Sequence, residues 1–200
     1  MLFLSCARVL VFFLSLVQML PTPSEAFFAL EGITLPATQH LNGTVLAFNG
    51  AGVRSVHFFG FHFKIYVAGF YAEQPIRSSD HALAASGRPM QLLFTFLRSV
   101  GQDKVKEAWK RQLDASVSHH YDGFSDDRDS FIQMFGPIAN GGTEMIQFIG
   151  EDTVIYDQGQ HKGVIAGRNF QRAFLSMWFG ERAVAADLKA ALLGAPLCSP

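Results

Sequence analysis

Cysteine is almost absent from the sequence, since only Cys6 and Cys198 occur among 200 residues. Cys6 lies in an N-terminal segment that we expect to be removed, which leaves a single thiol in the mature chain. A single thiol excludes an internal disulfide and the CxxC patterns of redox and zinc sites. We therefore predict a chain that uses no metal and no cofactor.

The sequence also lacks an excess of charge of either sign. It has 16 basic and 17 acidic residues, and the loss of Arg8 and Glu25 with the N-terminal segment leaves the net charge at −1. A strong positive field is the usual mark of proteins that bind nucleic acids or anionic lipid surfaces. We therefore expect no nucleic-acid partner.

No apolar run is long enough to span a membrane. The longest, Val9 to Leu20, follows Arg8 and falls well short of the roughly 20 residues that a spanning helix needs. Small residues at Ser24 and Ala26 then have the spacing of a cleavage site. Residues 1–26 are predicted to be a Sec signal peptide cleaved near Ala26, so that the mature protein is secreted or periplasmic, without stable membrane insertion. An uncleaved anchor is the alternative.

Phenylalanine is what the sequence has in abundance, at 20 of 200 residues. Such a number implies either a large aromatic core or an apolar cavity lined by rings. Residues 27–200 are of a size that usually forms one domain with its own core. We expect a single domain over these residues.

Strand signals dominate the first half of that domain and return later. Runs rich in β-branched and aromatic residues are separated by the glycine-containing stretches "NGAG" and Gly60, which we interpret as turns. We interpret Met90 to Leu97 as one continuous, mainly apolar run, which predicts a strand covered on both faces. The remaining predicted strands are Thr44 to Phe48, Val53 to Phe58, Phe61 to Ala72, Glu144 to Ile149, Thr153 to Asp157 and Lys162 to Ala166.

Helical periodicity begins after the Met90 strand. Val105, Trp109 and Leu113 recur at helical spacing, with charged residues between them, and predict an amphipathic helix. Shorter helices are expected at Ser130 to Phe135, Asn169 to Phe179 and Ala183 to Leu193. Strands and helices in separate runs predict an α+β fold, with one large antiparallel sheet and a helical layer on one face. The other face is then solvated or covered by something else.

A hairpin brings the candidate site residues together. With a three-residue loop at Phe59 to Phe61, Arg54 lies directly opposite Tyr66, and their side chains share one face of the sheet. Lys64 is expected on that face too. A two-residue turn instead shifts the register by one and moves Tyr66 to the other face.

Arg54 has no acidic residue near it in the sequence, because none lies between Glu31 and Glu73. A guanidinium stays charged and carries five donors that need partners. An anionic ligand, with a second hydrogen bond from Tyr66, is one candidate. The alternative is that Arg54 bonds backbone carbonyls or a distant acid such as Asp103.

The segment "FNGAGVRSVHFFGFHFKIYVAGFYAE" resembles the catalytic-strand region of the chalcone isomerase family. The later motifs "FLRSVGQDKVKEAW", "VIYDQGQHKGVIAGRNFQRAFLSMWFGE" and "DLKAALLG" resemble its bacterial chalcone-isomerase-like branch. The resemblance implies an open-faced β-sandwich, a large antiparallel sheet with a helical layer. In the family's enzymes it implies that the arginine matching Arg54 stabilises a phenolate, and that a hydroxyl at the position of Tyr66 places a water or the ketone oxygen.

Three polar contacts of those enzymes are missing, since their positions fall at Gly101, Ala108 and near Gln171. Noncatalytic plastid relatives bind fatty acids through an arginine and a tyrosine, which Arg54 and Tyr66 resemble. The resemblance therefore implies a noncatalytic binder of a small amphipathic, fatty-acid-like carboxylate or a polyphenol-like ligand. Its predicted site residues are Arg54, Tyr66, Lys64, Phe94, Trp109 and Phe174.

Other interpretations stay open. The chain could be an isomerase, an intramolecular lyase in which Arg54 and Tyr66 are catalytic and Arg54 stabilises an enolate or phenolate. It could also be an accessory protein without a ligand. His57 and His62, with Tyr66, could be imagined around a haem iron, and His119 with His120 as metal ligands. Phe174 belongs to an apolar helical face with Trp178, which is more typical of a core than of a ligand-binding wall.

Overall fold

The computed structural model describes residues 27–116 and 121–195. The predicted signal peptide, Cys6, Cys198 and the pair His119 and His120 lie outside the described residues. Among those that are described, no helix has both the length and the apolar character needed to cross a bilayer.

A single antiparallel sheet forms the body of the protein. Its seven strands are hydrogen-bonded in chain order, from β3 to β9, and each neighbouring pair is antiparallel. This confirms the predicted fold class. The strands are β3 (Thr38–Leu41), β4 (Thr44–Phe58), β5 (Phe61–Ala72), β6 (Met90–Phe96), β7 (Thr143–Ile149), β8 (Asp152–Asp157) and β9 (Gln160–Ile165).

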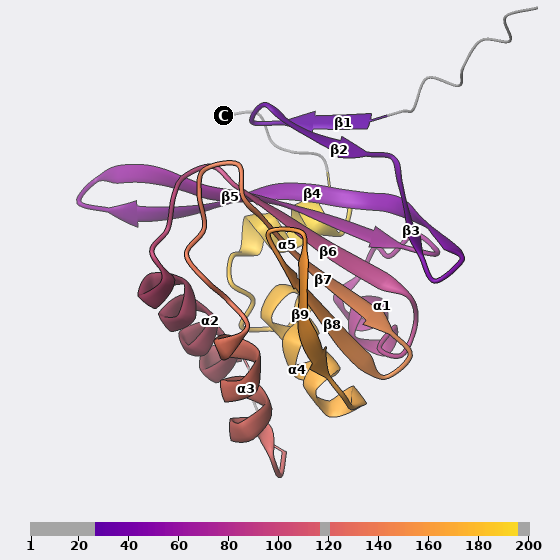
Figure 1. The fold of residues 1–200 in the computed structure, drawn as a ribbon. Helices are drawn as coiled ribbons and strands as arrows, with labels where there is room; N and C mark the ends of the chain where they lie inside the picture. The colour runs from indigo at the N-terminus through magenta and orange to yellow at the C-terminus, as the bar shows by residue number, and fades with distance from the viewer. Residues whose placement is uncertain (1–26, 117–120, 196–200) are drawn as a thin grey trace, which may run out of the picture.

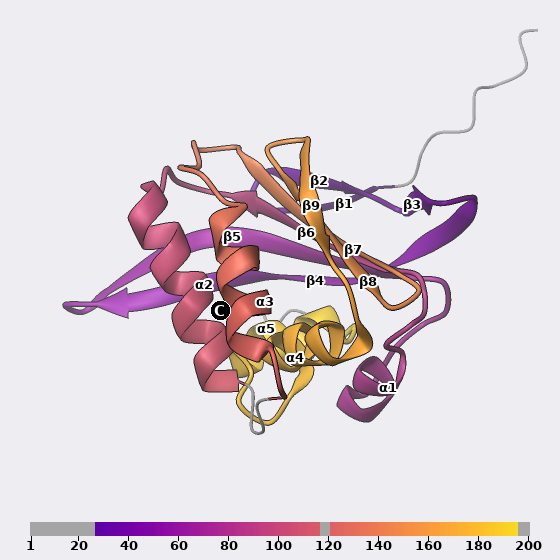
Figure 2. The ribbon, with the colours of Figure 1, turned by 60° about the horizontal axis from the view of Figure 1, so that its bottom comes forward.

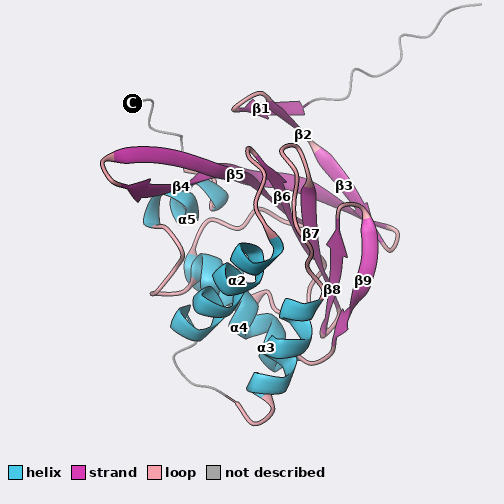
Figure 3. Ribbon diagram, turned by 60° about the vertical axis from the view of Figure 1, so that its left-hand side comes forward, coloured by secondary structure: helices cyan, strands magenta, loops and turns pink. Residues whose placement is uncertain are grey.

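The helices lie together on one face of this sheet (Figure 1, Figure 3). They are α1 (Ser79–Ala84), α2 (Gln102–Ser116), α3 (Phe124–Gln133), α4 (Arg168–Phe179) and α5 (Ala186–Leu192). The predicted periodicity of α2 is confirmed, because Val105, Trp109 and Leu113 are buried. The short helix α1 was not expected, and α3 begins well before the predicted Ser130.

A small hairpin covers part of the opposite face. It consists of β1 (Phe27–Leu30) and β2 (Ile33–Pro36), which form a separate two-stranded sheet. Leu35 of this hairpin is fully buried against Ala51 and Val67 of the large sheet. The hairpin lies above the sheet in Figure 1, with the helices below. No pattern in the sequence had indicated which segment covers this face.

The "NGAG" stretch is not a turn, which corrects the prediction. It lies inside β4, which runs without interruption past a register irregularity between Phe48 and Gly50. The glycines are needed because α5 packs directly on this strand. A Cβ at Gly50 would collide with the Ala191 carbonyl oxygen, and one at Gly52 would lie 2.8 Å from the Ala191 Cβ.

Buried Asn49 ties the same strand to α5 and to the segment before α1. Its amide nitrogen donates to the carbonyls of Ile76 and Leu192 at 2.9 and 2.7 Å, and its Oδ1 accepts from the Ile76 amide at 2.7 Å. The side chain therefore satisfies backbone groups that would otherwise be unpaired, including a carbonyl at the end of α5.

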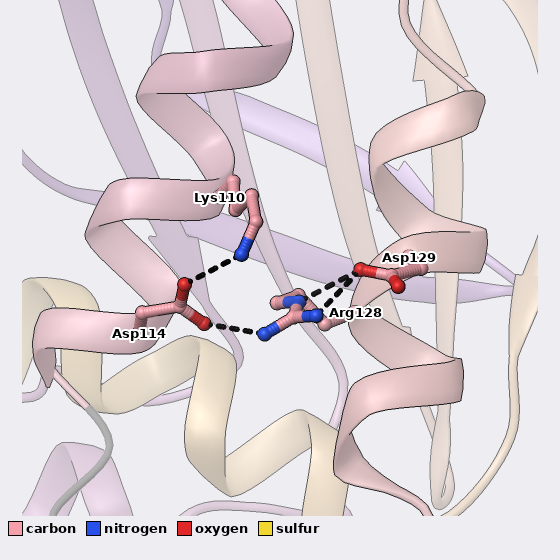
Figure 4. Close-up of polar contacts among 4 residues, drawn as sticks. All are labelled: Lys110, Asp114, Arg128 and Asp129. Atoms are coloured by element: carbon pink, nitrogen blue, oxygen red, sulfur yellow. Dashed lines mark hydrogen bonds and ion pairs between the residues drawn. The ribbon is translucent and has the colours of Figure 1, made fainter.

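An ion-pair network joins α2 to α3 (Figure 4). Arg128 of α3 contacts Asp114 of α2 at 2.8 Å and its neighbour Asp129 at 2.8 Å, while Lys110 contacts Asp114 at 2.9 Å. The Arg128 side chain is only 14% exposed, whereas those of Asp114 and Asp129 are 36% and 61% exposed, so this link has the modest strength of a partly exposed ion pair. It helps to hold α2 in place over the sheet (Figure 2).

The close approach of α5 gives a test of the fold. We expect Gly50→Ala to destabilise the protein by about 3 kcal/mol or to prevent folding, because the added methyl group meets backbone oxygen atoms that cannot move aside. Gly101→Ala is the matched control, since a Cβ there has nothing within 4 Å. It should change stability by no more than about 0.5 kcal/mol. Urea unfolding of both variants measures this, and equal stabilities would contradict the packing described.

Candidate functional site

A β-bulge in β5 determines which side chains face the candidate site. The β4–β5 turn has two residues, Phe59 and Gly60, with φ angles of 46° and 79°, so Phe58 pairs with Phe61. The predicted three-residue loop is therefore wrong. The sequence misled because two-residue turns of this kind favour glycine, asparagine or aspartate at the first position, not phenylalanine.

The pairing of Arg54 with Tyr66 is nevertheless present. Ser55 pairs with Lys64 and Arg54 pairs with Tyr66, which leaves Ile65 without a partner on β4. An extra residue in one strand shifts the register by one, and this shift cancels the effect of the shorter turn. Ile65 and Tyr66 both pack against the helix-facing core.

Lys64 does not share that face, which corrects the prediction. Its Nζ lies 2.7 Å from Oε1 of Glu31 at the β1–β2 turn, on the opposite side of the sheet. The physical reason is the bulge, because Lys64 precedes the extra residue and Tyr66 follows it. Lys64 therefore helps to hold the outer hairpin and is not among the residues that line the cavity.

A cavity of about 180 Å³ lies between the sheet and α2. Its floor contains buried Phe94 and Trp178, while Lys104 and Arg111 of α2 are exposed and mark its mouth. Of the predicted site residues, Arg54, Tyr66, Phe94 and Trp109 line it. The other lining residues are Val56, Ile65, Phe96, Val100, Val105, Ala108, Gln112, Glu144 and Val184.

Aromatic rings form most of the apolar wall. The Tyr66 ring lies 5.4 Å from that of Phe94, in an edge-to-face arrangement, and Phe94 lies 5.1 Å from Trp178. Such spacings are those of well-packed aromatic pairs. Phe174 does not line the cavity: it is fully buried in the core behind Trp109, at a ring distance of 5.8 Å.

Arg54 is a partly buried cation at this cavity. Its one hydrogen bond among the described residues runs from Nη1 to the Ser55 carbonyl oxygen at 2.7 Å, and no described carboxylate forms an ion pair with it. The alternative partner Asp103 is therefore not used. Lys104 and Arg111 add positive charge at the mouth, although Arg111 also contacts Glu107 at 3.4 Å.

Tyr66 presents a protonated phenol. Burial raises the pKa of its hydroxyl above the usual range, Arg54 opposes that rise, and Glu144 adds to it. The Tyr66 side chain has ring contacts but no hydrogen bond with any described residue. Its hydroxyl therefore remains able to donate to a bound group.

Glu144 is the site residue that sequence reasoning missed. It is 1% exposed, lines the cavity, and pairs across the sheet with Phe94 on one side and Asp157 on the other. Burial and the Asp157 charge raise its pKa well above the ordinary value, and a hydrogen bond from Trp109 partly opposes the rise. Period-two alternation was the available signal, because Glu144 shares its strand face with buried Ile146 and Phe148.

Gly101, Ala108 and Gln171 stand at the three positions where the family's enzymes carry polar substrate contacts. Ala108 offers only a methyl group to the cavity, and Gly101 does not line it. Gln171 is fully buried and hydrogen-bonds to backbone groups. Its side-chain oxygen accepts from the Gly87 amide, and its side-chain nitrogen donates to the carbonyls of Gly150 and Asp152. These positions give no substitute for the enzymes' polar contacts.

His57 and His62 form an exposed cross-strand pair near the hairpin tip, with their Nε2 atoms 2.6 Å apart. Neither histidine lines the cavity with Tyr66, so the haem arrangement imagined from the sequence is not assembled.

A larger hollow of about 270 Å³ lies beside α1. It is lined mainly by loop residues, and none of its lining residues has an unpaired buried polar side chain, so the cavity at Arg54 is the better candidate site.

The buried carboxyl of Glu144 gives a pH-dependent prediction. A carboxyl whose pKa is raised on folding contributes stability at acidic pH that is lost as pH rises through its folded pKa. We therefore expect the unfolding free energy of wild type to fall, relative to that of Glu144→Gln, between about pH 5 and pH 8. Urea titrations at both pH values measure this difference. A difference independent of pH would contradict a buried, proton-retaining Glu144.

Comparison with known proteins relates this fold to a family and to a solved structure. A family model described as chalcone isomerase-like matches residues 27–194. The chain is similar to the crystal structure of a fatty-acid binding protein of Arabidopsis thaliana, with a TM-score of 0.71 and 14% identity, over 84% of this chain and 96% of that chain. No curated protein matches it in sequence. At 14% identity the structural likeness shows the fold alone, whereas the family match spans the whole described domain, and the chain belongs to the chalcone isomerase-like family.

Proposed function

We propose that the protein is an exported, noncatalytic binder of a small amphipathic acid. The carboxylate of the ligand binds Arg54 and accepts a second hydrogen bond from the Tyr66 hydroxyl. The apolar part lies among the rings of Phe94, Trp109 and Trp178. Export is proposed from residues 1–26 alone, through their signal-peptide pattern.

The main support for the proposal comes from the contacts of Arg54. A half-buried guanidinium with one backbone bond, at an apolar cavity and without a carboxylate partner among the described residues, needs an anion. Lys104 and Arg111 at the mouth favour an approaching anion further. The accessory-protein alternative would need Arg54 bonded wholly to protein groups, with no cavity beside it.

The size of the cavity limits the ligand. Pockets for drug-sized molecules usually measure about 300–1,000 Å³, whereas this cavity measures about 180 Å³. A single ring or a short chain fits this volume better than a long acyl chain does. The similar Arabidopsis protein is a fatty-acid binding protein, which supports an amphipathic acid as the ligand class.

An isomerase is the second candidate, and Glu144 favours it. A buried carboxyl that retains its proton, in one cavity with Arg54 and Tyr66, could donate a proton while Arg54 stabilises an enolate or phenolate. The missing contacts at Gly101, Ala108 and Gln171 argue against chalcone closure, because each lost oxyanion donor costs about 2.7–4 kcal/mol.

The first test is extraction of the bound ligand. The mature protein is purified, and its bound acids are extracted and quantified by mass spectrometry. We expect Arg54→Ala to lose most of the acid, because a charge-assisted hydrogen bond contributes about 1.5–3 kcal/mol. Arg98→Ala is the matched control, since it removes a cation that stacks 4.9 Å from the Phe63 ring and does not line the cavity. Equal amounts of acid in wild type and Arg54→Ala would overturn the carboxylate site.

The second test separates binder from enzyme. We expect a hydroxylated chalcone to keep its visible absorbance when it is incubated with the protein, because the polar contacts needed for closure are missing. A loss of absorbance that is abolished in Arg54→Ala but kept in Arg98→Ala would establish the isomerase and reject the noncatalytic account.

A further inference from the structure

Two exposed imidazoles lie side by side near the end of the β4–β5 hairpin. His57 and His62 pair directly across the two strands, and their Nε2 atoms are 2.6 Å apart. Phe58 and Phe61 close the two-residue turn with a hydrogen-bonded pair, so the histidines form the next, non-hydrogen-bonded pair, in which side chains lie closer together. The hairpin end projects beyond the helices (Figure 1, Figure 2), which leaves both rings open to solvent.

The histidine pair lies on the face of the sheet opposite to the candidate cavity. Val56, the neighbour of His57, lines that cavity, and successive side chains of a strand point to opposite faces. Lys64, two residues beyond His62, lies on the same outer face, where its charge is balanced by Glu31 at 2.7 Å. A site at the two histidines is therefore separate from the proposed ligand site.

Two neutral imidazoles in this arrangement can exchange their shared hydrogen bond for a metal ion. A neutral ring carries one N–H and one lone pair, so the bond between the Nε2 atoms uses the N–H of one ring and the lone pair of the other. When the donor ring carries its proton on Nδ1 instead, both Nε2 lone pairs face the space between the rings. Neutral imidazole nitrogens are the commonest metal ligands in proteins.

The separation of the two nitrogens favours a metal that takes ligands at right angles. Metal–imidazole bonds measure about 2.0–2.1 Å, so nitrogens at a right angle lie about 2.9 Å apart and nitrogens at a tetrahedral angle about 3.3 Å apart. The distance of 2.6 Å has to open by about 0.3 Å for the first arrangement and by about 0.7 Å for the second. Square-planar and tetragonal sites are typical of Cu²⁺ and Ni²⁺, whereas Zn²⁺ is usually tetrahedral, and Cu²⁺ is the most tightly bound of the three.

We propose that His57 and His62 together bind one Cu²⁺ ion through their Nε2 atoms, with water at its remaining positions. Among the described residues no third histidine, cysteine or acidic side chain completes a metal-binding group with them. The expectation that the chain uses no metal rested on its cysteine patterns, and an imidazole pair falls outside that argument. The inference goes beyond the proposed function and does not depend on it.

Copper titration of the protein without an affinity tag tests the inference. Calorimetry with Cu²⁺ as the probe should show one strong, saturable site per chain in wild type, with weaker binding of Ni²⁺ and Zn²⁺. His57→Ala and His62→Ala should each weaken Cu²⁺ binding by about tenfold or more, and the double variant should lose little more, because the two rings act as a unit. The double variant His119→Ala/His120→Ala is the matched control, since it removes the other histidine pair of the chain. It should leave the Cu²⁺ affinity within about twofold of wild type.

Electron paramagnetic resonance of the bound Cu²⁺ then identifies its ligands. Wild type should show coupling to two imidazole nitrogens, and either single variant should lose it. Equal Cu²⁺ affinity in wild type and His57→Ala/His62→Ala would overturn the site. So would single variants that each keep half of the bound copper, because the rings would then bind separate ions. Loss of binding only in the His119→Ala/His120→Ala control would overturn it as well. Thermal melting without metal shows that each variant is folded.

Discussion

One extra residue in β5 determines the geometry on which the site depends. The tight turn at Phe59 and Gly60 alone would direct Tyr66 away from the helices, and unpaired Ile65 restores it to the side of Arg54. The same bulge leaves Lys64 on the outer face, where it pairs with Glu31 of the β1–β2 hairpin. A local irregularity thus places the phenol beside the guanidinium and a cation beside the outer hairpin.

The arrangement of charge supports the proposed amphipathic anion. Cations lie at the mouth and at Arg54, rings line the middle, and the buried acid at the floor favours its uncharged form. Because two strands separate the strand of Arg54 from that of Glu144, the acid does not neutralise the guanidinium. The positive charge of Arg54 therefore stays available to an anion.

The elements that follow from hydrophobic periodicity could be predicted from the sequence. The antiparallel sheet, α2 with its buried Val105 and Trp109, and α4 follow from patterns that extend over many residues. Sequence reasoning failed where tertiary contacts decide: the glycines at Gly50 and Gly52 make room for α5 and do not form a turn, and the bulge at Ile65 has no local signal. Glu144 was missed because an acid at the start of a strand is usually solvated, and its burial depends on α2.

We propose that Arg54 binds the carboxylate of a small acid. A crystal structure of the mature protein with 4-acetylbenzoate bound tests it most directly. We expect the carboxylate within hydrogen-bonding distance of the Arg54 guanidinium and the Tyr66 hydroxyl, with the ring among Phe94, Trp109 and Trp178. A carboxylate bound elsewhere, with Arg54 still bonded only to the Ser55 carbonyl, would contradict it.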